Sequence, residues 1–248
     1  MRVKSFRLEA MAALEQIRLY ELTLENGRSA SPFVWRIRYA LAHKGLPFES
    51  EYLGFREIPA KFSGRFKTVP VIECGDTMMA ESWDIAEYLD RAYPDHPALF
   101  TSPAELAMVR LTDQWFTAEV MRKMFRIYIL DVHDAADPKD RPYFRESREK
   151  GFLRGRSLED FTADRLSRLP ALREALAPLR AHLAMFPFLG GANPNFADYI
   201  VLGAFVWAGS VGTVPMLPAD DSLRPYIERG LDLYGGLARD PRMKPLFE

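Results

Sequence analysis

The 248-residue chain contains a single cysteine, Cys74. One cysteine cannot form an internal disulfide, and without a C-x-x-C pair the chain cannot carry out dithiol redox chemistry on its own. Scarce cysteine is typical of a reducing compartment, so we expect a cytoplasmic protein. No basic neighbour or helix N-terminus adjoins Cys74 in the sequence, and we interpret it as an inert thiol.

The chain also lacks long apolar runs and blocks of like charge. No stretch approaches the roughly 18 to 20 apolar residues of a membrane-spanning helix, so we expect no membrane contact. The net charge is −1 and no basic stripe occurs, which argues against nucleic acid as a partner. Asp131, His133 and Asp134 come closest to a metal-ligand cluster, but we interpret this stretch as a solvated loop edge and predict no bound metal.

What is present is ordinary globular composition, with 48% hydrophobic and 27% charged residues. We predict two domains, at residues 17–96 and 103–248, joined by a semi-rigid linker that is rich in proline. Residues 1–16 show no signal-peptide pattern, and we expect them to be a disordered extension. Met11 stands just before the first strand pattern and is an alternative to Met1 as the natural start.

Strand and helix patterns alternate in the first domain. Four strands are predicted, at residues 17–22, 48–53, 68–74 and 77–80. Between the first two strands, Ser31 and Pro32 are the N-cap and first residue of a helix that Gly45 ends. Another helix begins at Glu81 and Ser82, after the hairpin formed by the last two strands. The order βαβ followed by ββα predicts an α+β, thioredoxin-like domain.

Strand patterns stop after the linker, so we predict an all-α second domain. One long helix is expected from Pro103 to about Leu130, followed by the loop D-A-A-D-P-K-D-R-P. Asn195 and Asp198 lie three residues apart before an apolar run, which is close to the capping box that opens a helix.

Two features of the first domain suit a peptide-like ligand. Pro70 interrupts a strand, and a cis Val69–Pro70 bond would turn the backbone of Val69 outward for pairing with an extended peptide. An ordinary edge strand explains the proline equally well. Glu81 and Ser82 could hold the amino and carboxylate ends of an amino acid, because a helix N-terminus favours an anion. Ordinary capping is the alternative for Ser82.

Other side chains have two possible roles each. The Ser31 hydroxyl, beside a helix dipole, can donate to a thiolate and lower its pKa from roughly 8.5, and this role is compatible with simple capping. Trp115, Phe125 and Tyr128 lie on the long predicted helix. They either line a second pocket or pack in the core, as aromatic residues at helical spacing often do.

The segments S-P-F-V-W-R-I-R-Y-A-L-A-H-K-G, T-V-P-V-I and E-S-W-D-I-A-E-Y-L together resemble those of the cytosolic glutathione transferases. The resemblance covers nearly all of residues 17–247 and is closest to the bacterial β-etherase-like and fungal Fua-like groups. This finer grouping rests on stretches of the second domain that resemble those of the two groups, among them F-R-I-Y-I-L-D-V-H-D, G-F-L-R-G-R-S-L-E-D-F and N-F-A-D-Y-I-V-L-G-A-F-V-W.

The resemblance implies a role for each matching residue. Ser31 stands at the thiol-activating position. Val69 matches the valine whose backbone pairs with the glutathione cysteine, with Pro70 in cis, and Thr68 belongs to the same glutathione-binding segment. Glu81 and Ser82 hold the γ-glutamyl end. The glycine carboxylate needs a cation, and four candidates remain open: Arg56, Lys61, Arg65 and Lys67. Two further residues of the Ser31 loop are alternative donors to the thiolate: Asn26 and Ser29.

The implied protein is a homodimeric enzyme with glutathione as co-substrate. Serine at position 31 leaves the glutathione sulfur free to attack a hydrophobic, aromatic electrophile, whereas cysteine would favour disulfide exchange. The grouping implies cleavage of lignin-type β-aryl ethers. The alternative is a non-catalytic, glutathione-primed binding protein for phenolic or flavonoid compounds, because both functions need the same first domain.

Overall fold

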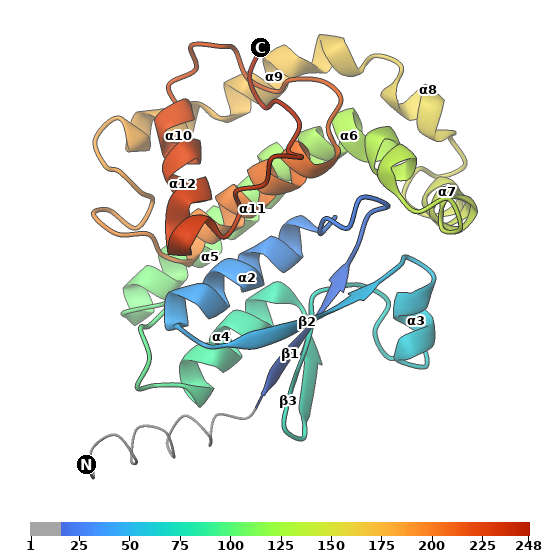
Figure 1. Ribbon diagram of the computed structural model, residues 1–248. Coiled ribbons are helices and arrows are strands. Elements are labelled where there is room, and N and C mark those ends of the chain that lie inside the picture. Colours follow the sequence, from blue (N-terminus) through green and yellow to red (C-terminus); the bar gives the residue numbers. More distant parts are fainter. Residues whose placement is uncertain (1–15) are drawn as a thin grey trace.

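A four-stranded mixed sheet forms the first part of the structure (Figure 1). The computed structural model describes residues 16–248, so the expected extension lies outside the described residues except for Gln16, and Met11 lies outside them too. The strands are β1 (Ile17–Leu22), β2 (Phe48–Leu53), β3 (Val71–Cys74) and β4 (Thr77–Ala80), in the spatial order β2-β1-β3-β4. β1 pairs in parallel with β2, and β3 runs antiparallel to both β1 and β4.

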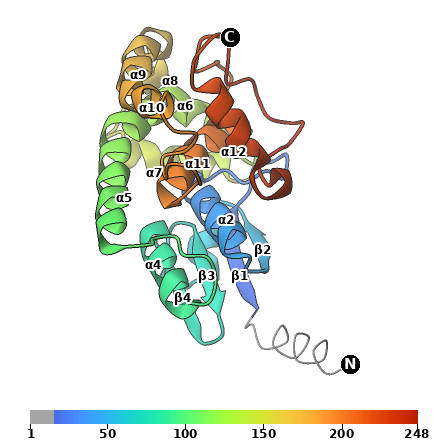
Figure 2. The ribbon, with the colours of Figure 1, turned by 90° about the vertical axis from the view of Figure 1, so that its left-hand side faces the viewer.

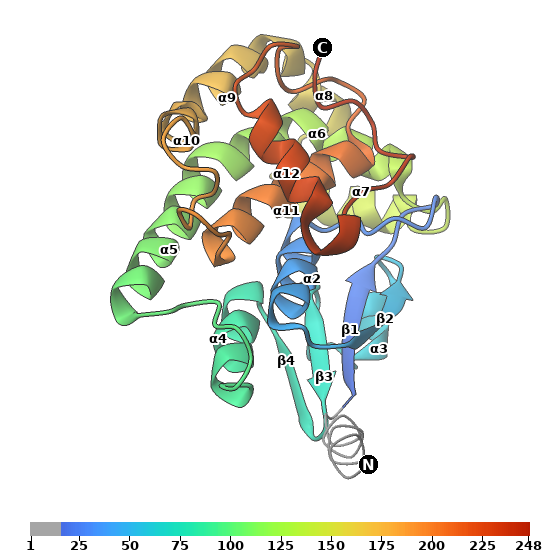
Figure 3. The ribbon, with the colours of Figure 1, turned by 60° about the vertical axis from the view of Figure 1, so that its left-hand side comes forward.

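Three helices belong to this first domain: α2 (Pro32–Lys44), α3 (Glu57–Lys61) and α4 (Ser82–Ala92). Figures 2 and 3 show α2 between the sheet and the second domain. Ser31 caps α2 by accepting a hydrogen bond from the Val34 N–H at 3.3 Å, and Gly45 ends the helix with a φ of 65°. These are the predicted caps. The short helix α3 was not predicted, because its five residues include a proline and show no apolar period.

The third strand begins later than predicted. Residues 68–70 lie outside the sheet, and β3 starts at Val71. Pro70 has no N–H to donate to a strand ladder, which is why the paired segment starts beyond it. The Val69–Pro70 peptide is cis, as predicted.

Beyond the linker, the described residues form helices. They are α5 (Pro103–Trp115), the π-helical η1 (Phe116–Met121), α6 (Arg122–Ala135), α7 (Arg141–Lys150), α8 (Leu158–Thr162), the 3₁₀ helix η2 (Arg165–Arg168), α9 (Leu169–Ala175), α10 (Ala177–Leu183), α11 (Phe196–Val211) and α12 (Arg224–Gly236). The predicted combination of a thioredoxin-like domain and an all-helical domain is confirmed. None of the helices in residues 16–248 has the length and apolar character needed to cross a membrane.

The first long helix extends further than predicted. Helices α5, η1 and α6 follow one another without a break to Ala135, whereas the sequence suggested an end near Leu130. The D-V-H-D stretch therefore lies inside α6, and its interpretation as a loop edge was wrong. Asp131 is 4% exposed, and its buried carboxylate accepts hydrogen bonds from Arg165 at 2.7 Å and from the Thr213 N–H at 3.0 Å.

Helix α11 forms the centre of the second domain, and all of its residues are buried. The predicted capping box is present, with Asn195 as N-cap and the Asp198 carboxylate accepting from the Asn195 N–H at 3.0 Å. Gly203 allows α11 to lie directly on the first turn of α2. A Cβ atom at this position would be 2.6 Å from the carbonyl oxygen of Pro32, closer than side-chain carbons approach backbone oxygen.

We expect Gly203→Ala to lower the free energy of unfolding by about 1 to 3 kcal/mol, because the two helix backbones must separate to admit the methyl group. The higher helix propensity of alanine offsets only part of this cost. Chemical denaturation followed by circular dichroism measures the change.

Gly209→Ala is the matched control, since it makes the same substitution in the same helix. The atom nearest to its added Cβ is the terminal methyl of Met243, which can rotate away. We expect this variant to stay within about 1 kcal/mol of the parent protein. Equal losses in the two variants would show that the α2–α11 approach is not a tight constraint.

Candidate functional site

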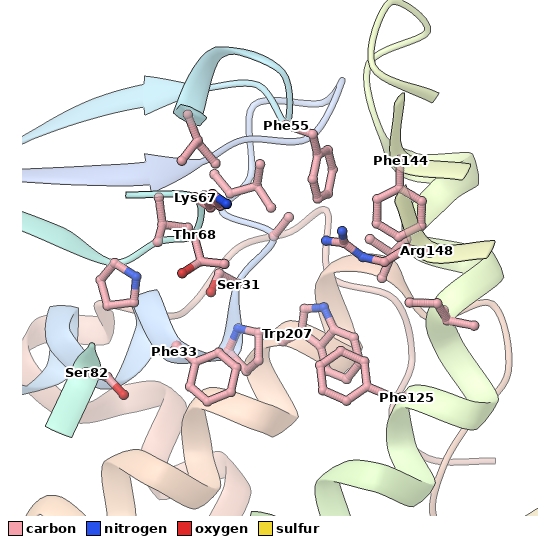
Figure 4. Close-up of a pocket in the computed structure, with 18 of the residues that line it drawn as sticks. Ser31, Phe33, Phe55, Lys67, Thr68, Ser82, Phe125, Phe144, Arg148 and Trp207 are labelled. Carbon is pink, nitrogen blue, oxygen red and sulfur yellow. The ribbon is translucent and has the colours of Figure 1, made fainter. Parts of the chain in front are cut away.

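A cavity of about 370 Å³ lies where the two domains meet (Figure 4). Its first-domain lining comes from the ends of strands and the starts of helices: Leu22, Ala30, Ser31, Pro32, Phe33, Phe55, Ile58, Lys67, Thr68, Val69, Pro70, Glu81 and Ser82. Its second-domain lining comes from α6, α7 and α11: Phe125, Ile129, Val132, Tyr143, Phe144, Arg148 and Trp207. The first wall is rich in polar and backbone groups, and the second is mainly aromatic and aliphatic.

Ser31 lies at the first-domain wall, at the N-terminus of α2. Its side chain is almost buried, at 6% exposure for the residue, and its oxygen accepts the Val34 N–H. A hydroxyl that accepts one hydrogen bond keeps its own proton for donation. The serine can therefore cap the helix and donate to an anion in the cavity at the same time, and the partial positive charge of the helix N-terminus favours such an anion.

Thr68, Val69 and Pro70 line the cavity just before β3. Because they lie outside the sheet, the backbone groups of Val69 are not committed to a strand ladder. An extended ligand could pair with them in the manner of an added strand.

Glu81 and Ser82 reach the same cavity from the N-terminus of α4. Glu81 has a positive φ of 70°, a backbone conformation that costs a non-glycine residue about 1 to 3 kcal/mol. Its side chain is exposed, whereas Ser82 is 6% exposed. The cavity thus contains the Glu81 carboxylate together with two kinds of donor, the Ser82 hydroxyl and the free N–H groups at the start of α4. The carboxylate suits an ammonium group of a ligand, and the donors suit a carboxylate group of the same ligand.

Four basic residues were candidates for an anion site, and of these Lys67 lines the cavity. Its side chain is labelled in Figure 4. Lys61 is paired with Glu51 at 2.6 Å, and Arg65 donates to the carbonyl oxygen of Met78 at 3.2 Å. Arg56 is likewise not among the lining residues.

The two alternative donors in the Ser31 loop do not line the cavity. Ser29 is buried at 2% exposure, and the exposed Asn26 uses its side-chain oxygen to accept the Arg28 N–H at 3.0 Å. Cys74 is also buried, with its sulfur 2.9 Å from the Tyr93 hydroxyl.

Of the three aromatic residues singled out in the sequence, Phe125 lines the cavity. Tyr128 is 1% exposed, and its hydroxyl donates to the carbonyl oxygen of Val214 at 2.9 Å, which places it in the core. Trp115 packs against Phe116 at the end of α5 and is not among the lining residues.

The sequence analysis did not single out Phe144, Arg148 and Trp207 as cavity residues. Phe144 and Arg148 lie four residues apart on α7, so they share a helix face, and this spacing was a usable signal. Trp207 lies in an apolar run that is buried throughout, and no periodicity there distinguishes a cavity wall from the core.

Within residues 16–248, no group of three or more His, Cys, Asp and Glu side chains is arranged to hold a metal ion. His133 and Asp134 do interact, with the histidine Nδ1 2.7 Å from an aspartate oxygen. Asp131, their neighbour in the sequence, is occupied by Arg165 and Thr213.

A mixed sheet of this topology, followed by a helical domain with a cavity at the junction, defines a two-domain protein with a thioredoxin-like first domain and an all-helical second domain. Residues 30–92 match the family model for the glutathione S-transferase N-terminal domain, and residues 107–214 match that for the C-terminal domain. Glutathione S-transferase U12 of Arabidopsis thaliana is 30% identical over 213 residues, covering 83% of this chain and 72% of the plant protein. The chain therefore belongs to the glutathione S-transferase family.

Solved structures agree on the fold. A glutathione S-transferase of Ceriporiopsis subvermispora, determined in complex with glutathione, has a TM-score of 0.77 at 21% identity and covers 91% of this chain and 99% of its own. Glutathione transferase GSTFuA3 of Phanerochaete chrysosporium has a TM-score of 0.70 at 26% identity, covering 91% and 94%. Matches to several other plant transferases span less than half of those proteins.

Proposed function

We propose that the protein is a glutathione transferase that binds glutathione along the first-domain wall and activates its thiol with Ser31. The observation that carries the proposal is that Ser31, the Thr68–Pro70 segment and the Glu81–Ser82 pair line one cavity, although they come from three separate parts of the chain. Glu81 and Ser82 would hold the γ-glutamyl end, and Val69 would pair through its backbone with the cysteine. Lys67 would pair with the glycine carboxylate.

Thiol activation follows from the position of Ser31. A thiolate in front of the α2 N-terminus would accept the Ser31 hydroxyl proton in a hydrogen bond and would interact favourably with the helix dipole. Both interactions stabilise the ionised sulfur, so the thiol pKa would fall below its ordinary value of roughly 8.5. At neutral pH a larger fraction of bound glutathione is then the nucleophilic thiolate.

The second substrate is proposed to be aromatic, because Phe33, Phe125 and Trp207 surround the space beside Ser31 (Figure 4). The likeness to GSTFuA3 agrees with the Fua-like grouping. The proposal of β-aryl ethers as substrates rests on the sequence resemblance to the β-etherase-like group. In that reaction the sulfur forms a bond to the β-carbon, the carbon–oxygen bond breaks, and the phenolate leaves with the electron pair. A phenol pKa near 10 makes this a tolerable leaving group.

We expect Ser82→Ala to weaken glutathione binding by about tenfold or more, because a lost hydrogen bond to a charged group costs about 1.5 to 3 kcal/mol. Lys67 is exposed, so Lys67→Gln should weaken binding only a few-fold. Calorimetric titration with glutathione measures both. Lys61→Gln is the control, since this lysine pairs with Glu51 outside the cavity and its loss should leave the affinity unchanged. Unchanged affinity in the first two variants would refute the placement.

Ser31→Ala is expected to raise the pKa of bound glutathione by about one to two units while leaving its affinity largely intact. The variant should therefore lose activity mainly at neutral pH and regain part of it as the pH rises. Thiolate absorbance followed against pH measures the shift.

Ser102→Ala separates thiol activation from helix capping. Ser102 caps α5 by accepting the Glu105 N–H at 3.1 Å, in an exposed position away from the cavity. Both alanine variants should lose about 1 kcal/mol of stability. A pKa shift confined to Ser31→Ala supports the proposed mechanism, whereas an unshifted titration would leave Ser31 a structural residue.

A steady-state assay with a guaiacyl β-aryl ether and glutathione tests the reaction. Turnover should release the phenol and form the glutathione thioether in equal amounts. Tight binding of the ether without turnover would instead indicate a glutathione-primed binding protein.

The cytoplasmic location stays a prediction. The homodimer also stays a prediction, and sedimentation equilibrium can test it.

A further inference from the structure

The helical wall of the cavity carries a cation among its aromatic residues. Arg148 extends from α7, and its guanidinium points toward the interior in Figure 4. The guanidinium carbon lies 4.8 Å from the ring centre of Phe144 and 6.0 Å from that of Phe55. Attraction to these ring faces helps to orient the group.

Arg148 lacks the acidic partners that the neighbouring arginine of the same helix has. Arg145 donates to Glu149 at 2.9 Å and to Glu159 at 2.7 Å. Arg148 donates to the Ser147 hydroxyl at 3.1 Å, and within residues 16–248 no carboxylate forms an ion pair with it. Burial lowers the pKa of the Arg148 guanidinium, although an arginine stays protonated at neutral pH. A half-buried charge without a counterion is left ready to bind an anion.

The position of α7 over the cavity is set by contacts with the first domain. Asp140, directly before α7, is 1% exposed and accepts the Phe55 N–H at 3.0 Å and the Arg56 N–H at 3.2 Å. The rings of Phe55 and Phe144 meet edge to face, with centres 4.8 Å apart. Arg148, one turn beyond Phe144, is therefore held at a defined place across the cavity.

We propose that Arg148 binds a carboxylate on the second substrate, which makes aromatic carboxylates a substrate class of this protein. The inference rests on the proposed transferase function. The planar guanidinium fork matches a carboxylate in two parallel hydrogen bonds. An aromatic ring beside it would pack on Phe125 and Trp207, whose rings have centres 5.0 Å apart. In the proposed function the carboxylates of glutathione bind elsewhere, at Lys67 and the N-terminus of α4, which line the first-domain wall.

The test compares 4-chloro-3-nitrobenzoate with its methyl ester, which has a similar shape but no charge. In both reactions the glutathione sulfur forms a bond to the ring carbon that carries chlorine, and chloride leaves with the bonding electrons. The ester group, para to the reacting carbon, activates the ring more strongly than the carboxylate does, so the two compounds differ in intrinsic rate. Recognition is therefore measured as the change that each variant makes in the ratio of kcat/KM for the two compounds. Arg148→Gln removes the charge, Arg148→Lys retains it, and Arg145→Gln is the control on the same helix.

We expect Arg148→Gln to lower kcat/KM for the carboxylate about 10- to 100-fold and to change that for the ester less than about twofold. Arg148→Lys should recover part of the loss, because it keeps a cation but not the bidentate geometry. Arg145→Gln should leave the ratio of the two substrates unchanged. Retained ester turnover shows that the variants are folded.

Equal losses for both substrates, or no loss for either, would overturn the inference. So would a weaker glutathione affinity in Arg148→Gln, since the arginine would then serve the tripeptide. Calorimetric titration with 4-chloro-3-nitrobenzoate alone needs no turnover, and loss of its binding in Arg148→Gln but not in Arg145→Gln is the expected result. If the parent protein neither binds glutathione nor converts the ester, the proposed function fails, while this titration still decides the role of Arg148.

Discussion

The direct packing of α11 on the first turn of α2 is the contact on which the cavity depends. Gly203 faces the carbonyl oxygen of Pro32 so closely that no side chain fits between the two helices. Trp207 follows one turn later in α11 and reaches the cavity. Because Ser31 directly precedes Pro32, this one contact sets the distance between the candidate thiol-activating serine and the aromatic wall.

Buried polar contacts hold the loop before Ser31 to the same helix. Arg28 is 3% exposed, donates to the Ser210 hydroxyl at 3.1 Å and forms an ion pair with Asp240 at 3.1 Å. Burial lowers the pKa of this guanidinium, and Asp240 opposes the effect. Across the cavity, Asp140 ties α7 to the loop after β2. Both walls are thus anchored outside the cavity, and the lining groups are left available for a ligand.

Prediction from the sequence succeeded where a signal acts over a few residues. The caps of α2, the hairpin of β3 and β4 and the capping box of α11 all have their predicted form. The π-helical turn η1 between α5 and α6 was not predicted, because the residue types show no local signal for it. It has more residues per turn than an α-helix and so changes the helix face on which later side chains lie.

The sequence by itself determined the order of elements, the helix ends and the residue types at each helix start, because these depend on backbone conformation and hydrogen bonds between near neighbours. Tertiary structure decided which side chains share the cavity. Lys67 lines the cavity, whereas Lys61 forms an ion pair with Glu51. Arg148 lines the same cavity from a helix some eighty residues further along the chain. Which residues line the cavity depends on how the two domains pack. Packing brings together residues that lie far apart in the sequence, and no local sequence pattern predicts such contacts.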